Sequence, residues 1–448
     1  MKFSTVKRLL HQGREHVWNR FNRVGEKLRE TVPPALMFWS KFKRAQFLAK
    51  LRKVRRRDHS GPDAFPRASF VDNRPGLHVI VFDDHVPAPD RDSGSARMFL
   101  ILKSLVKLGQ PVFISLSNLR RPEYERMLNQ AGVEIVPWID YKRVLKRRRF
   151  RVALFSRPDV AGALMSSIKR TAPRIKSIYD TVDIVFLRLE RERLMVGDEH
   201  VAQLARRYKK LETRLARSCD QVWCVTSEDQ AALAQEAPSA RFQIIPNIHP
   251  LQDRGKSFAA RQGLLFIGNF LHRPNTDAIH YFIQEIYPLV REAIPSVALF
   301  IVGDHAPPEI AAYASNEVTI TGYVADVDPI FQSCRVFIAP LRFGAGMKGK
   351  IGQALSYGLP VVTTSVGAEG MGLENGREAL IADGAREFAE ALISVYNDGA
   401  LWQRLSDHGY SHIARHFTPQ VVEEKIHQAI KALCDLSETD QSTVRTRD

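Results

Sequence analysis

The chain has 448 residues, and its 65 lysines and arginines outnumber its 49 acidic residues to give a net charge of +16. This length suits two domains, and the excess of cations favours anionic partners such as phosphorylated substrates, anionic lipid or nucleic acid. No stretch approaches the ~18 uninterrupted apolar residues of a membrane-spanning helix, and no secretory signal is recognisable. The four cysteines lack the companion cysteine or histidine pairs of a zinc site. We therefore expect a cytoplasmic protein without a bound metal.

Residues 1–75 lack any strand–helix alternation and are predicted to form a basic amino-terminal arm. Lys41–Arg57 carries nine cations and no acid, and Phe38, Phe42 and Leu48 fall at helical spacing beside it. One interpretation is a basic amphipathic helix at an anionic membrane surface, which would make the protein peripheral on the inner face of the plasma membrane. The other is a solvated basic arm. Nucleic-acid binding is disfavoured, because no recognition motif accompanies the charge.

Residues 76–246 repeat one pattern, in which short apolar runs are separated by segments of helix length. This pattern predicts a parallel sheet with crossover helices. The predicted strands are Leu77–Phe82, Val112–Ile114, Val133–Val136, Val152–Phe155, Ile175–Tyr179 and Val222–Val225.

The same pattern restarts after a polar segment, residues 247–262, which we interpret as an interdomain linker. Residues 263–436 then form the second predicted domain, and residues 437–448 a polar tail. The predicted strands of the second domain are Leu264–Gly268, Val297–Val302, Val318–Ile320, Val336–Ile338 and Val361–Val362. The predicted fold is therefore α/β, with two doubly wound, Rossmann-like domains facing across a cleft.

In each domain, one glycine-bearing loop comes after the first strand. In Asp90–Arg97, Ser93 or Ser95 could cap the following helix and Gly94 would let a ligand approach the backbone. In Gly268–Asn275, Arg273 lies where a helix N-terminus already favours an anion. The alternatives are a capped, solvated turn and an ordinary surface arginine.

The stretch RFGAGMKGKIGQALSYGLPVVTT, residues 342–364, carries the strongest signal. Gly344 and Gly346 free the backbone and Lys348 and Lys350 add positive charge between a strand and a helix, although the spacing is not that of a Walker loop. A further loop, Gly367–Gly372, has three glycines after the next strand. Together the four loops indicate a phosphate-bearing ligand in the cleft more strongly than any one of them does.

These residues also carry a family resemblance. RFGAGMKGKIGQALSYGLPVVTTSVGAEGM, VTITGYVADVDPIFQSCRVFIAPL and LLFIGNFLHRPNTDAI resemble the nucleotide-sugar domain of family 4 (group 1) glycosyltransferases of the GT-B fold. DHVPAPDRDSGSARM and SIYDTVDIVFLRLERER resemble first-domain segments of the same family. The likeness covers roughly residues 77–430, and the arm lies outside it.

The resemblance implies transfer of a sugar from a nucleotide-diphosphate sugar to a polysaccharide, lipid-linked or glycolipid acceptor, with retention and without a metal or other cofactor. The acceptor would bind mainly to the first domain and the donor to the second. The implied catalytic residues are Asp180, Asp183, Arg273 and Lys348. The implied donor-binding residues are Gly94, Ser95, Asn269, Tyr323, Val324, Gly344, Gly346, Met347, Lys350, Gln353, Glu369 and Gly370.

Three positions depart from the family pattern. The second glutamate of the usual Glu-x7-Glu motif, which grips the donor ribose, falls on Gln353, and the first falls on Ala345. A glutamine can accept a hydrogen bond but lacks the carboxylate charge. A histidine found in relatives is replaced by Val185.

Three alternative functions remain open from the sequence. A catalytically degenerate GT-B protein could bind a sugar nucleotide or a partner without turnover, as Gln353 and Val185 suggest. A nucleotide-sugar epimerase would need a cluster of carboxylates and histidines that the sequence does not display. A dinucleotide oxidoreductase would need a Gly-x-Gly-x-x-Gly motif after the first strand, and none follows it.

Overall fold

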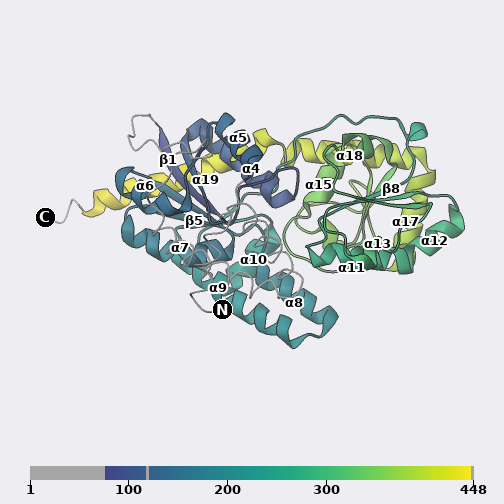
Figure 1. Ribbon diagram of the computed structural model, residues 1–448, viewed down its shortest axis with the longest axis horizontal. Coiled ribbons are helices and arrows are strands. Elements are labelled where there is room, and N and C mark those ends of the chain that lie inside the picture. The colour runs from purple at the N-terminus through teal and green to yellow at the C-terminus, as the bar shows by residue number, and fades with distance from the viewer. Residues whose placement is uncertain (1–75, 118–120, 445–448) are drawn as a thin grey trace, which may run out of the picture. The chain divides into compact units, whose positions relative to one another are not determined.

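A computed structural model describes residues 76–117 and 121–444 (Figure 1). The predicted basic arm, residues 1–75, lies outside the described residues. The part of the chain from Ala68 to Asp448 forms one compact unit, and it contains two parallel sheets with helices on both faces, as the sequence predicts.

The first sheet has the strand order β3-β2-β1-β4-β5-β6-β7, and every neighbouring pair is parallel. Its strands are β1 (Leu77–Asp83), β2 (Gly109–Ser115), β3 (Glu134–Ile135), β4 (Val152–Ser156), β5 (Lys176–Asp180), β6 (Gln221–Cys224) and β7 (Phe242–Ile244). The associated helices are α4 (Ser93–Leu108), α5 (Pro122–Gln130), the 3-10 turn η1 (Trp138–Asp140), α6 (Tyr141–Arg147), α7 (Pro158–Thr171), α8 (Val185–Val196), α9 (Glu199–Ser218) and α10 (Ser227–Glu236).

The central strands of this sheet are buried on both faces, because helices cover each side. Side chains of α6, α7, α9 and α10 share one core with Ile80, Phe82 and Phe155. Side chains of α4 and α5 share the other core with Val79 and Val81. Alternate residues of one strand thus enter opposite cores, which accounts for the nearly uninterrupted apolar runs.

The second sheet has the order β10-β9-β8-β11-β12-β13 and is also parallel. Its strands are β8 (Leu264–Ile267), β9 (Leu299–Val302), β10 (Val318–Gly322), β11 (Val336–Ala339), β12 (Val361–Thr363) and β13 (Leu380–Ile381). The helical segments around it are η2 (Phe258–Ala260), α11 (Arg273–Tyr281), η3 (Phe282–Ile286), α12 (Tyr287–Ala293), α13 (Pro308–Ala311), α14 (Asp328–Ser333), α15 (Gly349–Ser356), α16 (Ser365–Ala368), α17 (Ala385–Asn397) and α18 (Gly399–His416). Between α11 and α12 the segment η3 is a π-helix, so the helical run from Arg273 to Ala293 is α-helical only at its two ends.

The last helix, α19 (Pro419–Val444), corrects the predicted domain boundary. Five of its apolar side chains are buried in the core formed by β1, α4 and α5: Val422, Ile426, Ala429, Ile430 and Leu433. The core of the second domain instead ends with Ile413 and Phe417. Residues from 419 onward therefore pack with the first domain, not with the domain predicted to extend to residue 436.

The strand orders show where ligands would bind. In both sheets the winding direction reverses beside the first strand, between β1 and β4 in one and between β8 and β11 in the other. Loops at the carboxyl ends of such strands form the usual binding crevice of doubly wound sheets. These loops include the residues after β1, the residues after β4, and the glycine-lysine segment after β11.

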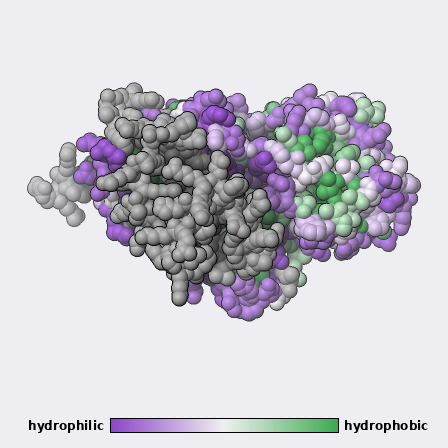
Figure 2. Space-filling view, in the orientation of Figure 1, coloured by the Kyte–Doolittle hydropathy of each residue, from purple (hydrophilic) through white to green (hydrophobic). Residues whose placement is uncertain are grey.

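The visible surface is mainly hydrophilic, with apolar residues gathered in a small area over the second domain (Figure 2). Across the described residues, no helix has both the length and the apolar character needed to cross a membrane.

Candidate functional site

The glycine-lysine segment lies between β11 and α15, at the carboxyl edge of the second sheet. Gly344 and Gly346 have φ values of 155° and 68°, which side chains rarely allow. Lys348 precedes the first residue of α15, and its Nζ donates to the carbonyl of Gly346 at 2.6 Å. Only 9% of the Lys348 side chain is exposed, and desolvation lowers the pKa of its ammonium group. The loop therefore holds a cation, at a helix N-terminus, that is largely shielded from water.

Lys350 supplies a second cation to the same edge. Its Nζ donates to Oδ1 of Asn275 at 2.5 Å and lies 4.1 Å from the centre of the Phe266 ring. Desolvation lowers the pKa of Lys350 to about 7. Because no carboxylate of the described residues lies within ion-pair distance of Nζ, an entering anion would find this charge uncompensated.

The first domain contributes side chains directly to this loop. The Arg191 guanidinium of α8 donates to the carbonyl of Gly344 at 2.6 Å and to both carboxylate oxygens of Glu369 at 2.6 and 2.7 Å. The amide of Gly346 donates to Oδ1 of Asp229, in α10, at 3.3 Å. Burial raises the pKa of Asp229 to about 7. The candidate site is thus built from both domains.

Two further glycines, Gly349 and Gly370, lie where the two domains touch. A Cβ atom added to Gly349 would stand 2.4 Å from Cβ of Ser93, and one added to Gly370 would stand 2.1 Å from Cγ2 of Thr226. Contacts this short do not occur in folded proteins, so a side chain at either position would push the two domains apart. These glycines allow close approach by the first domain's backbone and side chains.

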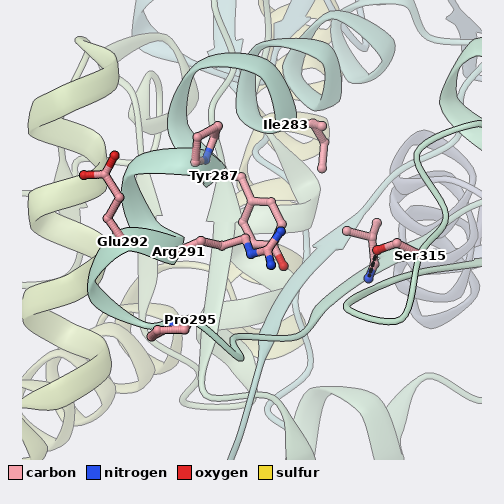
Figure 3. Close-up of a pocket in the computed structure, with 8 residues that line it drawn as sticks. Ile283, Tyr287, Arg291, Glu292, Pro295 and Ser315 are labelled. Carbon is pink, nitrogen blue, oxygen red and sulfur yellow. Dashed lines mark hydrogen bonds between the residues drawn. The ribbon is translucent and has the colours of Figure 1, made fainter.

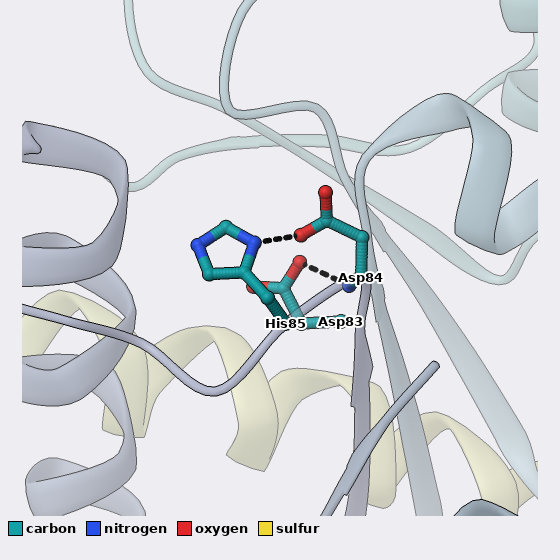
Figure 4. A group of neighbouring side chains, drawn as sticks. All are labelled: Asp83, Asp84 and His85. Carbon is teal, nitrogen blue, oxygen red and sulfur yellow. Dashed lines mark hydrogen bonds and ion pairs between the residues drawn. The ribbon is translucent and has the colours of Figure 1, made fainter. Parts of the chain in front are cut away.

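The first domain presents a charged cluster at the end of β1 (Figure 4). The Asp84 carboxylate contacts Nδ1 of His85, whose Nε2 lies 3.2 Å from Oγ of Ser95. Nε of Arg157 lies 3.1 Å from Asp83 and 3.4 Å from Asp84. Hydrogen bonding and charge from Asp84 outweigh burial and raise the pKa of His85. Arg157, at the end of β4, has a φ of 75°, a strained conformation that is frequent at functional sites.

Asp83, Asp84 and His85 place ligand atoms within 4.8 Å of one another, as a metal site requires. However, the Arg157 guanidinium already pairs with both carboxylates. The arrangement fits a charge-balanced set of polar side chains at the edge of the first sheet better than a cation site.

A second contact between the domains lies at the ends of β9 and β10. The Arg91 guanidinium stacks 3.4 Å from the centre of the Tyr323 ring and lies 3.3 Å from Oδ2 of Asp304. The Tyr323 hydroxyl donates to Oδ2 of Asp90 at 2.5 Å. The loop after β1 therefore reaches the second domain at Tyr323, one of the donor-binding residues that the resemblance implies.

With this geometry established, comparison with known families is informative. Residues 261–398 match the family model "Glycosyl transferases group 1". Most of the second domain therefore resembles group 1 glycosyl transferases. The match includes β8 to β13 and the whole Gly344–Lys350 segment.

Solved structures share the two-domain fold over four fifths of this chain. An uncharacterised 44.6 kDa protein from the cps region of Klebsiella pneumoniae is 25% identical over 191 residues, covering 41% of this chain. The match spans about half the length of that relative, 49%. HepE of Anabaena, solved in complex with UDP and glucose, superposes with a TM-score of 0.59 at 14% identity, over 80% of this chain and 100% of its own. Sucrose-phosphate synthase from Thermosynechococcus elongatus superposes with a TM-score of 0.60 at 13% identity, over 80% of this chain and 99% of its own. The predicted two-domain GT-B fold is confirmed.

The two aspartates predicted to face the cleft differ. Asp180 is completely buried and pairs with Nη1 of Arg97 at 2.9 Å, so its carboxylate does not reach the cleft. Asp183 is 26% exposed, pairs with Nε of Arg188 at 2.9 Å and lies against Gly346 of the second domain. The expectation for Asp180 is therefore wrong in its placement, because Arg97 of α4 binds it beneath the sheet edge.

Arg273 is the first residue of α11, and its guanidinium pairs with Glu192 of α8 at 2.5 Å. Pro274 lies in the first turn, as its position in the sequence suggests. Arg273 thus joins the two domains through an ion pair with Glu192.

The remaining predicted donor residues lie on three elements. Asp92, rather than Ser93 or Ser95, caps α4 by accepting from the amide of Ser95 at 2.8 Å. The Asn269 carbonyl accepts from Nδ2 of Asn275 at 2.7 Å. The Met347 carbonyl accepts from Nδ2 of Asn247 at 3.2 Å, so the segment between the domains also touches the loop.

Gln353, Val324 and Gly94 are each partly exposed. Gln353 lies on the second turn of α15, and its carbonyl accepts from Oγ of Ser356 at 2.7 Å. A Cβ atom on Gly94 would lie 3.3 Å from Nη2 of Arg157, which places Gly94 beside the charged cluster.

Val185, where relatives carry a histidine, is the first residue of α8. Its amide and that of Phe186 donate to the Glu212 carboxylate at 3.1 and 2.9 Å. Glu212, which is fully buried, also accepts from the Tyr179 hydroxyl at 3.2 Å. This carboxylate of α9 satisfies the amino end of α8 and so fixes the helix that carries Arg191.

Sequence reasoning missed several groups of the site. Asp84 and His85 follow the first strand directly, and the rule that ligands bind beyond strand ends could have drawn attention to them. Arg191 lies in a segment that carries the family resemblance, but it is not among the site residues that the resemblance implies. No sequence signal pointed to Arg157 or Asp229, since each reaches the site through the tertiary fold.

One surface pocket lies elsewhere on the second domain (Figure 3). It is lined by Ile283, Tyr287, Pro288, Arg291, Glu292, Pro295, Ser315 and Val318. These residues lie near the amino-terminal ends of β9 and β10, at the sheet edge opposite the glycine-lysine segment. The pocket therefore has no part in the candidate site.

Proposed function

We propose that the protein is a glycosyltransferase that moves a sugar from a nucleotide-diphosphate sugar to a polysaccharide, lipid-linked or glycolipid acceptor. The observation that carries this proposal is the glycine-lysine segment, in which Lys348 and Lys350 are held at the N-terminus of α15. The match to the group 1 glycosyltransferase model over the same residues supports it. So does the complex of the structural neighbour HepE with UDP and glucose.

The chemistry requires stabilisation of a leaving diphosphate. As the bond between the anomeric carbon and the phosphate oxygen lengthens, its electron pair passes to the diphosphate, and prearranged cations and amides stabilise that charge. Lys348, Lys350 and the backbone around Gly344 and Gly346 are suited to this role. We assign the acceptor to the first-domain edge near His85 and Asp183, and we propose transfer of a hexose with retention, without a metal, as in family 4.

The experiment is a thermal-shift panel of UDP-, GDP- and dTDP-linked sugars, followed by donor hydrolysis and transfer assays. A ligand at 100 times its Kd should stabilise the fold by about 2.7 kcal/mol. Lys348→Met and Lys350→Met keep much of the buried aliphatic volume but remove the charge, and both should weaken the shift. Lys256→Met is the matched control, because this exposed lysine precedes the second domain and binds Ser333 of that domain outside the site. If no nucleotide sugar shifts the unfolding midpoint, the donor-site assignment fails.

Gln353 favours a second candidate, a protein that binds the sugar nucleotide without turnover. It supplies no carboxylate charge where family members grip the ribose. Comparison of the wild type with Gln353→Glu separates the two candidates. Turnover by the wild type supports the enzyme, whereas binding without turnover, restored by glutamate, supports the degenerate protein.

We further propose that the basic arm holds the protein at an anionic membrane surface near its acceptor. The charge of Lys41–Arg57 and its neighbouring aromatic residues support this. The full-length chain should sediment with vesicles containing anionic lipid and not with neutral vesicles. Replacement of these nine cations by glutamine should abolish the sedimentation, and undiminished binding would refute the proposal.

A further inference from the structure

We propose that Arg191 is a ligand of the donor diphosphate that the first domain supplies to the second. This inference rests on the proposed function and extends it, because Arg191 is not among the donor-binding residues that the family resemblance implies. It makes the approach of the two domains part of the charge stabilisation, and not only a means of enclosing the substrates.

The position of Arg191 carries the inference. It lies on α8, which belongs to the first domain, yet its Nη1 donates to the carbonyl of Gly344 at 2.6 Å. Its Nη1 and Nη2 also bind the two oxygens of Glu369. Nζ of Lys348 lies 3.8 Å from Oε2 of the same carboxylate. A guanidinium of one domain and an ammonium of the other therefore converge on a single anion beside the glycine loop.

The donors of Arg191 leave capacity for a phosphate. A guanidinium has five N–H groups, and the hydrogen bonds to Gly344 and Glu369 use three of them. Among the described residues no hydrogen bond uses its Nε, and 29% of the side chain remains exposed. The planar, forked geometry of a guanidinium matches the oxygens of a phosphate as well as those of a carboxylate.

The structure around Arg191 also explains how it is held there. Glu212 binds the first amides of α8 from beneath, and Glu369 aligns the guanidinium with the loop. An ion pair used only to join the domains would not need to lie on the glycine segment. The neighbouring pair Arg273–Glu192 already joins the same helix to the second domain.

A cation that arrives with the other domain acts mainly when the domains are together. Its loss should therefore reduce turnover more than ground-state binding. In other phosphate-transfer sites, a single arginine supplied from outside the nucleotide-binding loop changes the rate by about 10³–10⁵-fold. For Arg191 we expect a decrease of at least about 100-fold, the lower range for one preorganised donor.

The test measures hydrolysis or transfer of the nucleotide sugar selected by the thermal-shift panel, together with the Kd of the corresponding nucleoside diphosphate. Arg191→Ala should lower kcat about 100-fold or more and weaken the Kd less than about 10-fold. Arg191→Lys, which keeps the charge but not the fork, should be intermediate. Arg193→Ala is the matched control, because Arg193 lies two residues further along α8 and is exposed. It should behave as the wild type.

The outcomes separate the inference from the proposed function. If the wild type binds and turns over a nucleotide sugar while Arg191→Ala retains its kcat, the inference fails and the proposed function stands. A weakened Kd with an unchanged kcat would also overturn it, because Arg191 would then act in ground-state binding alone. If the wild type binds no nucleotide sugar, both fail. Should Arg191→Ala unfold, Arg191→Lys decides, and a wild-type kcat in that folded variant would refute the inference.

Discussion

The imidazole ring of His249 lies against the backbone of Gly352, on the first turns of α15. A Cβ atom added to Gly352 would stand 2.2 Å from Nε2 of His249. His249 belongs to the segment that joins the two domains, and its amide donates to the carbonyl of Phe417 at 2.8 Å. The joining segment is therefore fitted against the helix that begins at the glycine-lysine loop, with no room for a side chain between them.

Replacement of Gly352 by alanine should destabilise the fold. Overpacking of a filled interior typically costs about 1–3 kcal/mol, and helix propensity offsets only part of this because alanine favours a helix over glycine by about 1 kcal/mol. The free energy of unfolding in urea measures the effect. The double variant Gly352→Ala with His249→Ala should recover stability relative to the sum of the single changes. Strict additivity would show that the contact is not tight.

His249 should make stability sensitive to acid. Burial lowers the pKa of its imidazole to about 4, whereas the unfolded chain protonates near 6.5. The stability that depends on neutral His249 is therefore present above pH 6.5 and is lost as the pH falls toward 4. Each pKa unit corresponds to about 1.4 kcal/mol, so the loss is at most about 3 kcal/mol. Urea unfolding at several pH values should show a weaker acid dependence for His249→Gln than for the wild type, and identical slopes would contradict the prediction.

Asp180 should matter for stability and not for chemistry. Removal of one partner from a fully buried ion pair typically costs about 3–5 kcal/mol, because the other charge is left uncompensated. Asp180→Ala should thus unfold much more readily than the wild type, while Asp180→Asn should lose less because it can still accept from Arg97. Chemical denaturation measures both, and nucleotide affinity of the folded fraction should stay unchanged. A stable Asp180→Ala variant without turnover would restore the catalytic assignment.

Asp229 should make donor binding sensitive to pH near neutrality. Its pKa is raised to about 7 by burial and by Asp183, against the opposing effect of Lys348. Above pH 7 the carboxylate carries a charge that opposes a diphosphate at the Gly346 amide, so affinity should fall as the pH rises. Deprotonation of Lys350 acts in the same direction. Isothermal titration should therefore show a reduced but not abolished pH dependence in Asp229→Asn.

The Asp229 carboxyl group should make stability depend on pH in the opposite direction from His249. The folded state keeps Asp229 protonated between its unfolded value near 3.9 and about 7. Its contribution to the free energy of unfolding is consequently present at low pH and is lost as the pH rises through this interval. Unfolding of Asp229→Asn should lack this component, and a pH dependence equal to that of the wild type would show that the group ionises normally.

The architecture was readable from the sequence because strands buried on two faces leave continuous apolar runs. The glycines and lysines that follow such strands also pointed to the carboxyl edge of the second sheet. The purpose of the glycines was less visible. Gly349 and Gly370 contact Ser93 and Thr226, residues more than a hundred positions away in the chain, and no local pattern specifies such a partner.

The aspartates of the YDTVD segment illustrate the same limit. Asp180 and Asp183 look equivalent in the sequence, since both follow an apolar strand. Their environments differ because Arg97 of α4 forms an ion pair with Asp180 and not with Asp183. Asp183 instead lies against Gly346. Arg191 and Asp229 were likewise beyond sequence reasoning, because their importance depends on where α8 and α10 approach the other domain.

The return of α19 to the first domain has a consequence for synthesis of the protein. Ser104 and Lys107 of α4 meet His427 and Glu423 of α19 at 3.2 and 2.8 Å, beside the apolar side chains that complete that core. The ribosome therefore synthesises the whole second domain before the first domain can bury the face of α4 that α19 covers. Nascent chains should expose that face to chaperones until the last helix emerges, even though the domain that needs it was made first.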